Sequence, residues 1–186
     1  MRMTSAYAVA LLIISLRQAS PAGVVDSSAG GFTVKEIVSI AAAPAEVYRR
    51  MTGDVAHWWN PQHTFSGSSL NLSIDPNAGG CFCEKLPDGG SVRHMVVVYA
   101  DPGRVIRLLG GIGPMQAMAA VGSMTWTFAA DGSGTRLEVV YAVGGYSPHG
   151  LQRMSVAADG VLREQVERLK RLIETGDAGN PLPRNK

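Results

Sequence analysis

The two cysteines of the chain, Cys81 and Cys83, are separated by one phenylalanine. On a strand, residues two apart point to the same face, with their Cα atoms ~6.6 Å apart. That spacing is near the outer limit for an unstrained disulfide. Because free cysteines are among the most buried residues, we favour two buried thiols that pack against the wall of a sheet or cavity.

Two alternatives for these cysteines stay open. A strained disulfide within one strand suits an oxidising compartment, where two free thiols are unusual. A site for zinc or cuprous copper would need further ligands, and His94 with Met95 on a neighbouring strand could supply them. Cys-x-Cys alone is a weak motif, so we expect no resident metal and no cofactor. A cysteine nucleophile would need a paired base, for which the sequence has no signature.

Large aromatic residues and methionines are candidates to line an apolar pocket. Trp58 and Trp59 are adjacent in a predicted short helix, so both cannot face one core and one can cap a cavity. Met115 and Met118 lie in a Gly-rich segment, residues 110–122, that can form a lid or plug a gap in the packing. The full set of expected ligand-binding residues is Trp58, Trp59, Cys81, Cys83, His94, Met115, Met118, Trp126, Tyr141 and Met154.

Candidates for acid–base chemistry are less clear. Glu36 and Glu84 each lie in a predicted strand, where an inward-facing carboxyl group would have a raised pKa. Exposure to solvent is the expectation for both, because glutamate is rarely buried. His57 and His63 are also expected on the surface. We therefore assign no catalytic residue and favour a binding protein over an enzyme.

The first 22 residues have the features of an export signal. A basic residue precedes an eleven-residue apolar run with one serine, residues 6–16, and small residues follow in QASPAG. The run is shorter than the ~20 apolar residues that span a bilayer. We therefore expect residues 1–22 to be a signal peptide, the mature protein to be periplasmic or secreted, and no stable membrane span to remain after cleavage.

The charge of the chain argues against nucleic acid as a partner. The 186 residues carry a formal net charge of +2, but residues 1–22 hold two of the 17 basic residues and no acidic one. The remainder has fifteen residues of each sign and no net charge. Such a domain lacks the basic surface that nucleic-acid binding requires.

Hydrophobic periodicity and turn residues predict the order of the elements. A strand over residues 32–40 is followed by two short helices, over 44–53 and 54–60. Six short strands follow, separated by Pro-Asp-Gly and Asp-Gly turns, at roughly 71–74, 81–86, 92–100, 105–109, 124–130 and 136–143. The last element is a long helix from about residue 150 to 175, with apolar residues three and four apart.

This order predicts an α+β fold. An antiparallel sheet must bury one face, and the final helix is the long amphipathic element that can cover it. We expect a curved sheet wrapped around that helix, with a cavity between them. The folded domain is expected over residues 32–175, with a flexible lead-in over 23–31 and a disordered tail over 176–186.

Four blocks of sequence carry a resemblance to known proteins: VSIAAAPAEVYRRMT, HWWN, AGGCFCEKLPDGGSVRHMVVVYADPGRVIRL and SMTWTFAADGSGTRLEVVY. With the C-terminal helix, they resemble the SRPBCC superfamily, whose helix-grip fold is shared by START lipid-transfer domains, polyketide cyclases and birch-pollen-allergen-like proteins. Within it, the chain is most similar to the branch named after activators of a heat-shock chaperone ATPase. The resemblance covers residues 32–175.

The resemblance implies an apolar cavity that binds a small hydrophobic molecule. The expected function is thus an exported binding protein for a lipid- or polyketide-like ligand. One alternative is an enzyme of the cyclase, dehydratase or lyase type, which would need Glu36, Glu84 or His94 to face the cavity. Another is a redox or soft-metal protein that uses Cys81 and Cys83. A chaperone partner is not expected, because an exported protein would not meet a cytosolic ATPase.

Overall fold

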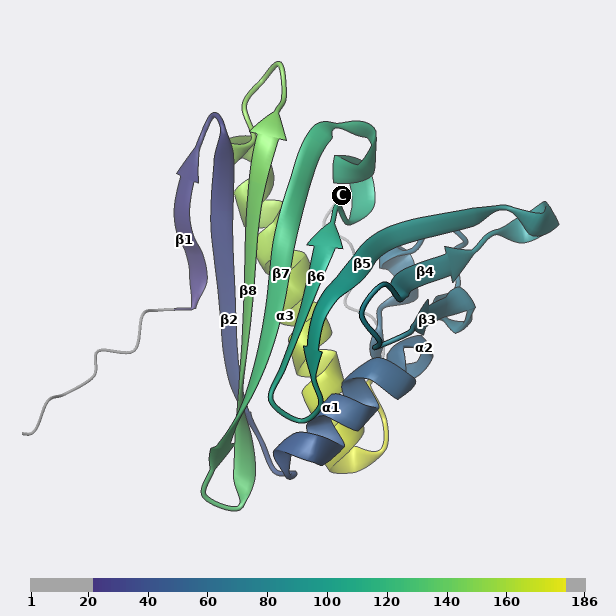
Figure 1. Ribbon diagram of the computed structural model, residues 1–186, viewed down its shortest axis with the longest axis vertical. Helices are drawn as coiled ribbons and strands as arrows, with labels where there is room; N and C mark the ends of the chain where they lie inside the picture. The colour runs from purple at the N-terminus through teal and green to yellow at the C-terminus, as the bar shows by residue number, and fades with distance from the viewer. Residues whose placement is uncertain (1–21, 180–186) are drawn as a thin grey trace, which may run out of the picture.

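The computed structural model describes residues 22–179, which form a curved antiparallel sheet, a long C-terminal helix and several short helical segments (Figure 1). The strands are β1 (Gly23–Ser28), β2 (Gly31–Ile40), β3 (Leu72–Ile74), β4 (Cys81–Lys85), β5 (Ser91–Asp101), β6 (Val105–Gly110), β7 (Ala119–Asp131) and β8 (Gly134–Tyr146). The α-helices are α1 (Pro44–Gly53), α2 (Val55–Trp58) and α3 (Gln152–Thr175). Short 3₁₀ turns are η1 (Pro61–His63), η2 (Ser69–Asn71), η3 (Pro87–Gly89) and η4 (Gly113–Ala117).

The eight strands pair antiparallel in the order β1-β2-β8-β7-β6-β5-β4-β3. From β3 to β8 each strand therefore lies beside the next one in the chain, and β2 pairs with β8. The long strands β7 and β8 are joined by a tight turn in which Gly132 has a φ of 58°. Glycine adopts this left-handed conformation without a steric penalty, so the turn keeps the two strands in register.

Alternation along β7 and β8 determines which face of the sheet is the core. The inward-facing residues of the two strands are Met124, Trp126, Phe128, Leu137, Val139 and Tyr141, and all are buried. Helix α1 packs its Tyr48 ring edge-on against Phe128, with centroids 5.5 Å apart. From α2, the indole of Trp58 lies 6.1 Å from that of Trp126. The two short helices thus cover one end of the concave face.

Helix α3 crosses this concave face along its length (Figure 1). Its buried stripe repeats at three and four residues and includes Ala158, Leu162, Val166 and Leu169. Full burial of one leucine side chain stabilises a fold by roughly 1.5–3 kcal/mol. The helix ends where Gly176 adopts a left-handed conformation and donates its N–H to the Leu172 carbonyl. Near this end, Lys170 Nζ donates to the Ser39 carbonyl of β2 at 2.6 Å.

The structure confirms the α+β helix-grip architecture, with a curved antiparallel sheet and a long C-terminal helix. Residues 23–31 differ from the expected flexible lead-in, because β1 pairs with β2 and forms an edge strand. Most of β1 is exposed. The backbone ladder rather than side-chain burial holds it, and a strand of that kind leaves no apolar alternation in the sequence.

The ends of the chain are described in part. The expected signal peptide lies outside the described residues, apart from residue 22. Residues 176–179, expected to begin a disordered tail, pack against α3: Ala178 is buried, and Arg168 Nη1 donates to the Gly179 carbonyl at 2.8 Å. The remainder of that tail lies outside the described residues. Over residues 22–179, none of the helices combines the length and apolar character needed to cross a membrane.

Candidate functional site

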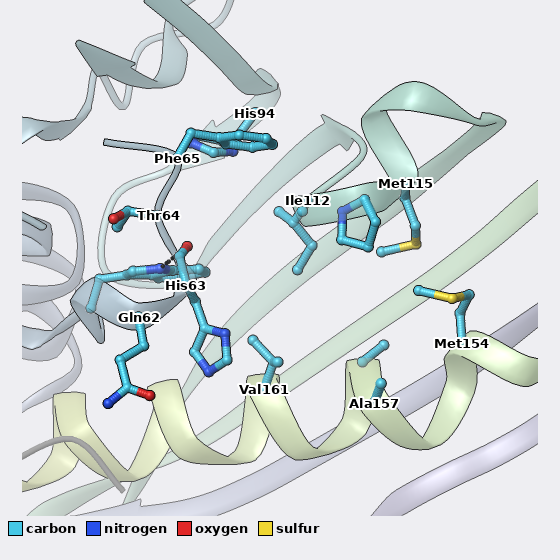
Figure 2. Close-up of a pocket in the computed structure, with 14 residues that line it drawn as sticks. Gln62, His63, Thr64, Phe65, His94, Ile112, Met115, Met154, Ala157 and Val161 are labelled. Atoms are coloured by element: carbon cyan, nitrogen blue, oxygen red, sulfur yellow. Dashed lines mark hydrogen bonds between the residues drawn. The ribbon is translucent and has the colours of Figure 1, made fainter. Parts of the chain in front are cut away.

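A pocket of about 410 Å³ lies between α3, the segment that follows α2 and the η4 turn (Figure 2). Its volume is within the range of roughly 300–1,000 Å³ that is usual for small-molecule sites. The lining residues are Trp59, Gln62, His63, Thr64, Phe65, His94, Ile112, Gly113, Pro114, Met115, Met154, Ala157, Ala158 and Val161. Most of the lining is apolar, and two histidines are its titratable groups.

Helix α3 forms one wall of the pocket. Met154, Ala157 and Val161 point from the same face of the helix toward the pocket (Figure 2). Their spacing of three and four residues places them one above another on that face. The small side chain at Ala157 leaves space that a larger residue would fill. The same helix therefore supplies both the core stripe and a lining with room for a ligand.

The segment that follows α2 forms a second wall and is tied to α3 through Asn60. The Asn60 backbone N–H donates to Gln165 Oε1 at 2.7 Å, and its side-chain amide donates to Glu164 Oε1 at 2.6 Å. Within the segment, Trp59 Nε1 donates to the His63 carbonyl at 3.0 Å (dashed in Figure 2). These bonds hold the segment against the helix and fix the plane of the Trp59 indole.

The η4 turn and the residues before it form a third wall. Ile112 and Met115 are buried here, and Met115 extends toward Met154 of α3 (Figure 2). At the base of this wall, the hydroxyl of Tyr141 donates to the Gly110 carbonyl at 3.3 Å. Methionine side chains adapt to ligands of different shape, so this wall can adjust to its ligand.

His94 lies at the end of the pocket farthest from α3 (Figure 2). Its Nε2 is 2.9 Å from Glu84 Oε2, and its Nδ1 is 3.2 Å from the side-chain amide nitrogen of Gln116. The imidazole also packs against the rings of Phe65 and Phe82, with centroids 5.9 and 4.9 Å away. Hydrogen bonds at both nitrogens and two aromatic neighbours therefore fix the orientation of the ring.

A β-bulge brings His94 and Glu84 together. The pairing of β4 with β5 shifts between Phe82 and Cys83, which leaves His94 as an extra residue on β5. Both His94 and the next residue, Met95, are consequently buried, although alternation would expose one of them. On β4, Glu84 is inward-facing, so the carboxylate and the imidazole meet beneath the pocket.

Glu84 is held in its charged form. Burial by itself raises the pKa of this carboxyl group, but hydrogen bonds outweigh that effect and lower the pKa below its usual range. The donors are the backbone N–H groups of Ser66 and Phe65 and the imidazole of His94. A carboxylate that accepts several such bonds stays ionised even where water is excluded. Glu84 therefore presents a fixed negative charge to His94.

His94 is held in its neutral form. Burial lowers the pKa of the imidazole below its usual range, and the opposing effect of the hydrogen bond and charge of Glu84 is smaller. Since a carboxylate can only accept hydrogen bonds, Nε2 carries the ring proton. Nδ1 is then the unprotonated nitrogen and accepts a hydrogen bond from Gln116. The site thus combines a neutral imidazole, a defined tautomer and a buried carboxylate.

A second imidazole–carboxylate pair lies on the opposite side of the pocket. His63 Nε2 is 3.1 Å from Glu164 Oε2 of α3. The His63 side chain keeps 30% of its surface exposed, whereas that of His94 keeps 5%. His63 therefore lies on the pocket wall rather than away from it, contrary to its expected surface position. His57 is exposed, as expected.

The structure brings together four of the predicted ligand-binding residues: Trp59, His94, Met115 and Met154 all line the pocket. Four others do not line it. Trp58, Trp126 and Tyr141 are buried in the core between sheet and helices, and Met118 is half-buried after η4. The pocket lies at one side of the helix–sheet interface, so residues that point to the centre of that interface are packed by their neighbours instead.

The two cysteines form a disulfide, which corrects the interpretation as free buried thiols. Their Cα atoms are 5.4 Å apart, closer than the ~6.6 Å of a flat strand and within the range usual for a disulfide. Both are half-buried and alternate with the inward-facing Phe82 and Glu84. They therefore occupy the outer face of the sheet and do not line the pocket.

The metal site left open as an alternative is not assembled either. Cys81 and Cys83 face away from the core, whereas His94 faces into it and binds Glu84. Within residues 22–179, no three histidine, cysteine, aspartate or glutamate side chains are grouped so that they could hold a metal ion.

Other differences from the sequence expectations concern buried carboxylates and loops. Glu36 and Glu84, both expected to face solvent, are 4% and 1% exposed. For Glu84 a signal existed, because it shares a strand face with Phe82. The lining residues Thr64, Phe65 and Ile112 lie in irregular segments without periodicity, so no sequence pattern marked them. Val161 belonged to the apolar stripe of the long helix, which does not separate lining residues from core residues.

Comparison with known protein families identifies the family to which the chain belongs. Residues 31–174 match the family described as polyketide cyclase / dehydrase and lipid transport. The chain belongs to this family. No curated protein is similar enough in sequence to count as a match.

Solved structures show the same fold at low sequence identity. A protein from Arthrobacter aurescens superimposes with a TM-score of 0.58 at 15% identity, over 87% of this chain and 99% of its own. Protein CV1439 from Chromobacterium violaceum gives 0.52 at 19% identity, over 76% and 96%. DynU16, a putative protein of the dynemicin biosynthetic locus, gives 0.55 at 20% identity, over 78% of this chain and 48% of its own. At these identities the comparison establishes the fold alone.

Proposed function

We propose that this protein is an exported binding protein for a small hydrophobic or amphipathic molecule, lipid- or polyketide-like, held in the pocket beside α3. The observation that carries the proposal is the mainly apolar lining of a pocket of about 410 Å³, formed by three separate segments of the chain. A site of this composition favours apolar ligands, because their burial removes apolar surface from water.

The arrangement of the walls supports the same proposal. One wall is a regular helix with small residues, and the opposite wall carries Ile112 and Met115, of which the flexible methionine tolerates ligands of different shape. The polar groups of His63 and His94 lie toward different ends, which suits a molecule with one or two polar substituents. The family description, which includes lipid transport, is consistent with such a ligand.

Export rests on the first 22 residues of the sequence. Expression of the full chain in a bacterial host, followed by fractionation and mass determination, tests it: the protein should be recovered outside the cytoplasm and be shortened near residue 22. Recovery of the uncut chain in the cytoplasm would contradict export. We propose no chaperone ATPase as partner, although the sequence blocks resemble that branch, because an exported protein would not meet one.

Ligand binding is tested with the purified protein and a defined probe. Trp59 lines the pocket, so a bound aromatic molecule should change its fluorescence. We expect saturable binding of 1-anilinonaphthalene-8-sulfonate with one molecule per chain, confirmed by native mass spectrometry, and its displacement by a medium-chain fatty acid. Lack of saturation, or a probe that the fatty acid does not displace, would overturn the proposal.

A further inference from the structure

We propose that His94 is a general base that removes a proton from a carbon atom next to a carbonyl group of the bound molecule, with Glu84 as its positioning residue. This inference rests on the proposed function, because the substrate must first bind in the pocket. It adds an activity and a substrate class: apolar ketones and related carbonyl compounds whose adjacent C–H bond is acidic.

The imidazole of His94 has a fixed orientation. Nε2 is committed to Glu84 at 2.9 Å, and the carboxylate is itself fixed by the backbone N–H groups of Phe65 and Ser66. Nδ1 is therefore the basic nitrogen. It is directed at Gln116 of the η4 turn, the same turn whose Met115 lines the pocket. Nδ1 thus faces the η4 turn, which forms one wall of the pocket that His94 itself lines.

Burying the ionised side chain of Glu84 costs free energy. The side chain has no exposed surface, and an ionised carboxylate in that position is expensive unless its charge interacts with something. The carboxylate accepts the N–H groups of Phe65 and Ser66 on different oxygens, which an amide with its single acceptor oxygen could not do. A charge at this position is useful when His94 becomes an imidazolium, because the carboxylate then stabilises the cation through a bond that already exists.

The proposed step needs no co-reactant. The proton moves from carbon to Nδ1, and the electron pair of the C–H bond forms the carbon–carbon double bond of an enolate, whose negative charge rests on the carbonyl oxygen. Gln116 leaves Nδ1 when the substrate binds there, and its amide can then donate to that oxygen. Return of a proton from Nδ1 to carbon restores the neutral imidazole. In heavy water, exchange at Nδ1 replaces the proton with a deuteron.

The experiment measures deuterium incorporation into two probes, 2-tetralone and 2-undecanone, by NMR in buffered heavy water. General bases contribute about 10²–10⁴-fold to such rates, so wild-type protein should raise the exchange rate of at least one probe by about 10²-fold above buffer. His94→Gln should return the rate to that of buffer in a protein that circular dichroism shows to be folded. His57→Gln, a change of the same kind at an exposed histidine, should behave like wild type.

Glu84→Gln tests the positioning residue. A glutamine can donate as well as accept, so it no longer forces the proton onto Nε2. We expect a large loss of exchange with retained probe binding, and a changed ratio of imidazole tautomers in the nitrogen NMR spectrum. A purely structural Glu84 would alter stability without this loss of rate in the folded protein.

If His94→Gln fails to fold, the wild-type pH profile decides. Glu84 is the charged group that interacts with the ring, and Phe65, Phe82 and Gln116 surround it without charge. The exchange rate should rise with pH as the His94 Cε1 proton signal reports deprotonation, and then level off. A rate that follows another group, or one abolished by His63→Gln instead, would overturn the proposal.

The two proposals fail in different ways. Saturable binding of 1-anilinonaphthalene-8-sulfonate with no acceleration for either ketone overturns the catalytic inference and leaves the binding function intact. Absence of saturable binding overturns the binding function itself.

Discussion

Glu36 on β2 and Asp159 on α3 are buried carboxyl groups placed close enough for a hydrogen bond where the helix crosses the sheet, and one oxygen of each has no other partner. A bond of this kind requires a proton on one of the two groups. Burial is the largest cause that raises the pKa of Glu36 to about 7, followed by the hydrogen bond and the negative charge of Asp159. Arg163, 3.5 Å from Asp159, offsets part of this effect, and Glu167 adds slightly to it.

This pair predicts that the protein becomes less stable as the pH rises from about 4.5 to about 7. In that range the folded protein keeps a proton on Glu36 that the unfolded chain, with the usual pKa of 4.5, has lost. Stability therefore falls across the range and levels off above it, by about 1–3 kcal/mol. Urea unfolding of wild type and Glu36→Gln at pH 5 and pH 8 measures this fall in the free energy of unfolding. The variant should lose this part of the pH dependence and be the more stable protein at pH 8.

Asp88→Asn is the control for this prediction, because Asp88 is exposed in the η3 turn and away from the pair. It should leave the pH dependence as in wild type. Equal pH dependence in wild type and Glu36→Gln would show that Glu36 does not hold the proton.

Filling the pocket from α3 should abolish ligand binding. Val161→Trp places a large ring in a space of about 410 Å³, whereas Val156→Trp on the same helix adds the same ring at a position that is 73% exposed. We expect the first variant to lose binding of 1-anilinonaphthalene-8-sulfonate by at least about tenfold and the second to keep it. Equal affinity in both variants would place the ligand elsewhere.

The hydrogen bonds of Asn60 should matter for both stability and binding. Asn60→Ala removes the bond to Glu164 and the acceptor for the Gln62 backbone N–H, a loss of about 1–3 kcal/mol. Because the segment that carries Trp59 then loses one of the two bonds by which Asn60 ties it to α3, probe affinity should fall as well. Asn77→Ala, in an exposed turn, is the matched control and should change neither quantity.

The disulfide between Cys81 and Cys83 should be dispensable for binding. It closes a very short loop, so its removal should lower the free energy of unfolding by at most about 2 kcal/mol. The Cys81→Ser, Cys83→Ser double variant should therefore fold and bind the probe as wild type does, since the outer face of β4 does not line the pocket. Urea unfolding checks the predicted stability, and fluorescence titration checks the predicted binding of the probe. Loss of probe binding would instead implicate the cysteines in the site.

Replacement of a core aromatic residue should be far more damaging than replacement at the surface. Trp126 is 2% exposed and contacts Trp58, so Trp126→Ala should cost about 3–5 kcal/mol. Tyr146→Ala, at a position that is 68% exposed near the end of β8, should change stability by less than about 0.5 kcal/mol. Thermal unfolding of both variants distinguishes the two positions, and similar losses would contradict the assignment of Trp126 to the core.

Local patterns determined much of the architecture. Alternation such as Met124, Trp126, Phe128 predicts a strand with one buried face, and the Asp-Gly turn at Gly132 predicts the hairpin that follows. The repeat of apolar residues in the final helix predicts α3 and its buried stripe. These features are properties of neighbouring residues, and a sequence displays them directly.

Local sequence patterns predicted the site only in part. Trp59, His94, Met115 and Met154 were expected to line a pocket, and they do line one. Their function as ligand-binding residues stays a prediction. The segments that complete the pocket are irregular, and their shape depends on long-range bonds such as that of Asn60 to α3, which connects residues 104 positions apart. No local pattern encodes such a bond.

By itself, the sequence determined the fold class and the mainly apolar character of the interior, because these follow from periodicity, composition and turn residues. Tertiary structure decided which side chains meet. The bulge on β5 turned His94 inward beside Glu84, Cys81 and Cys83 formed a bond on the outer face of β4, and the crossing of α3 buried Glu36 against Asp159. Each of these depends on strand register and helix placement, which are set by the packing of the whole domain rather than by any short stretch of the chain.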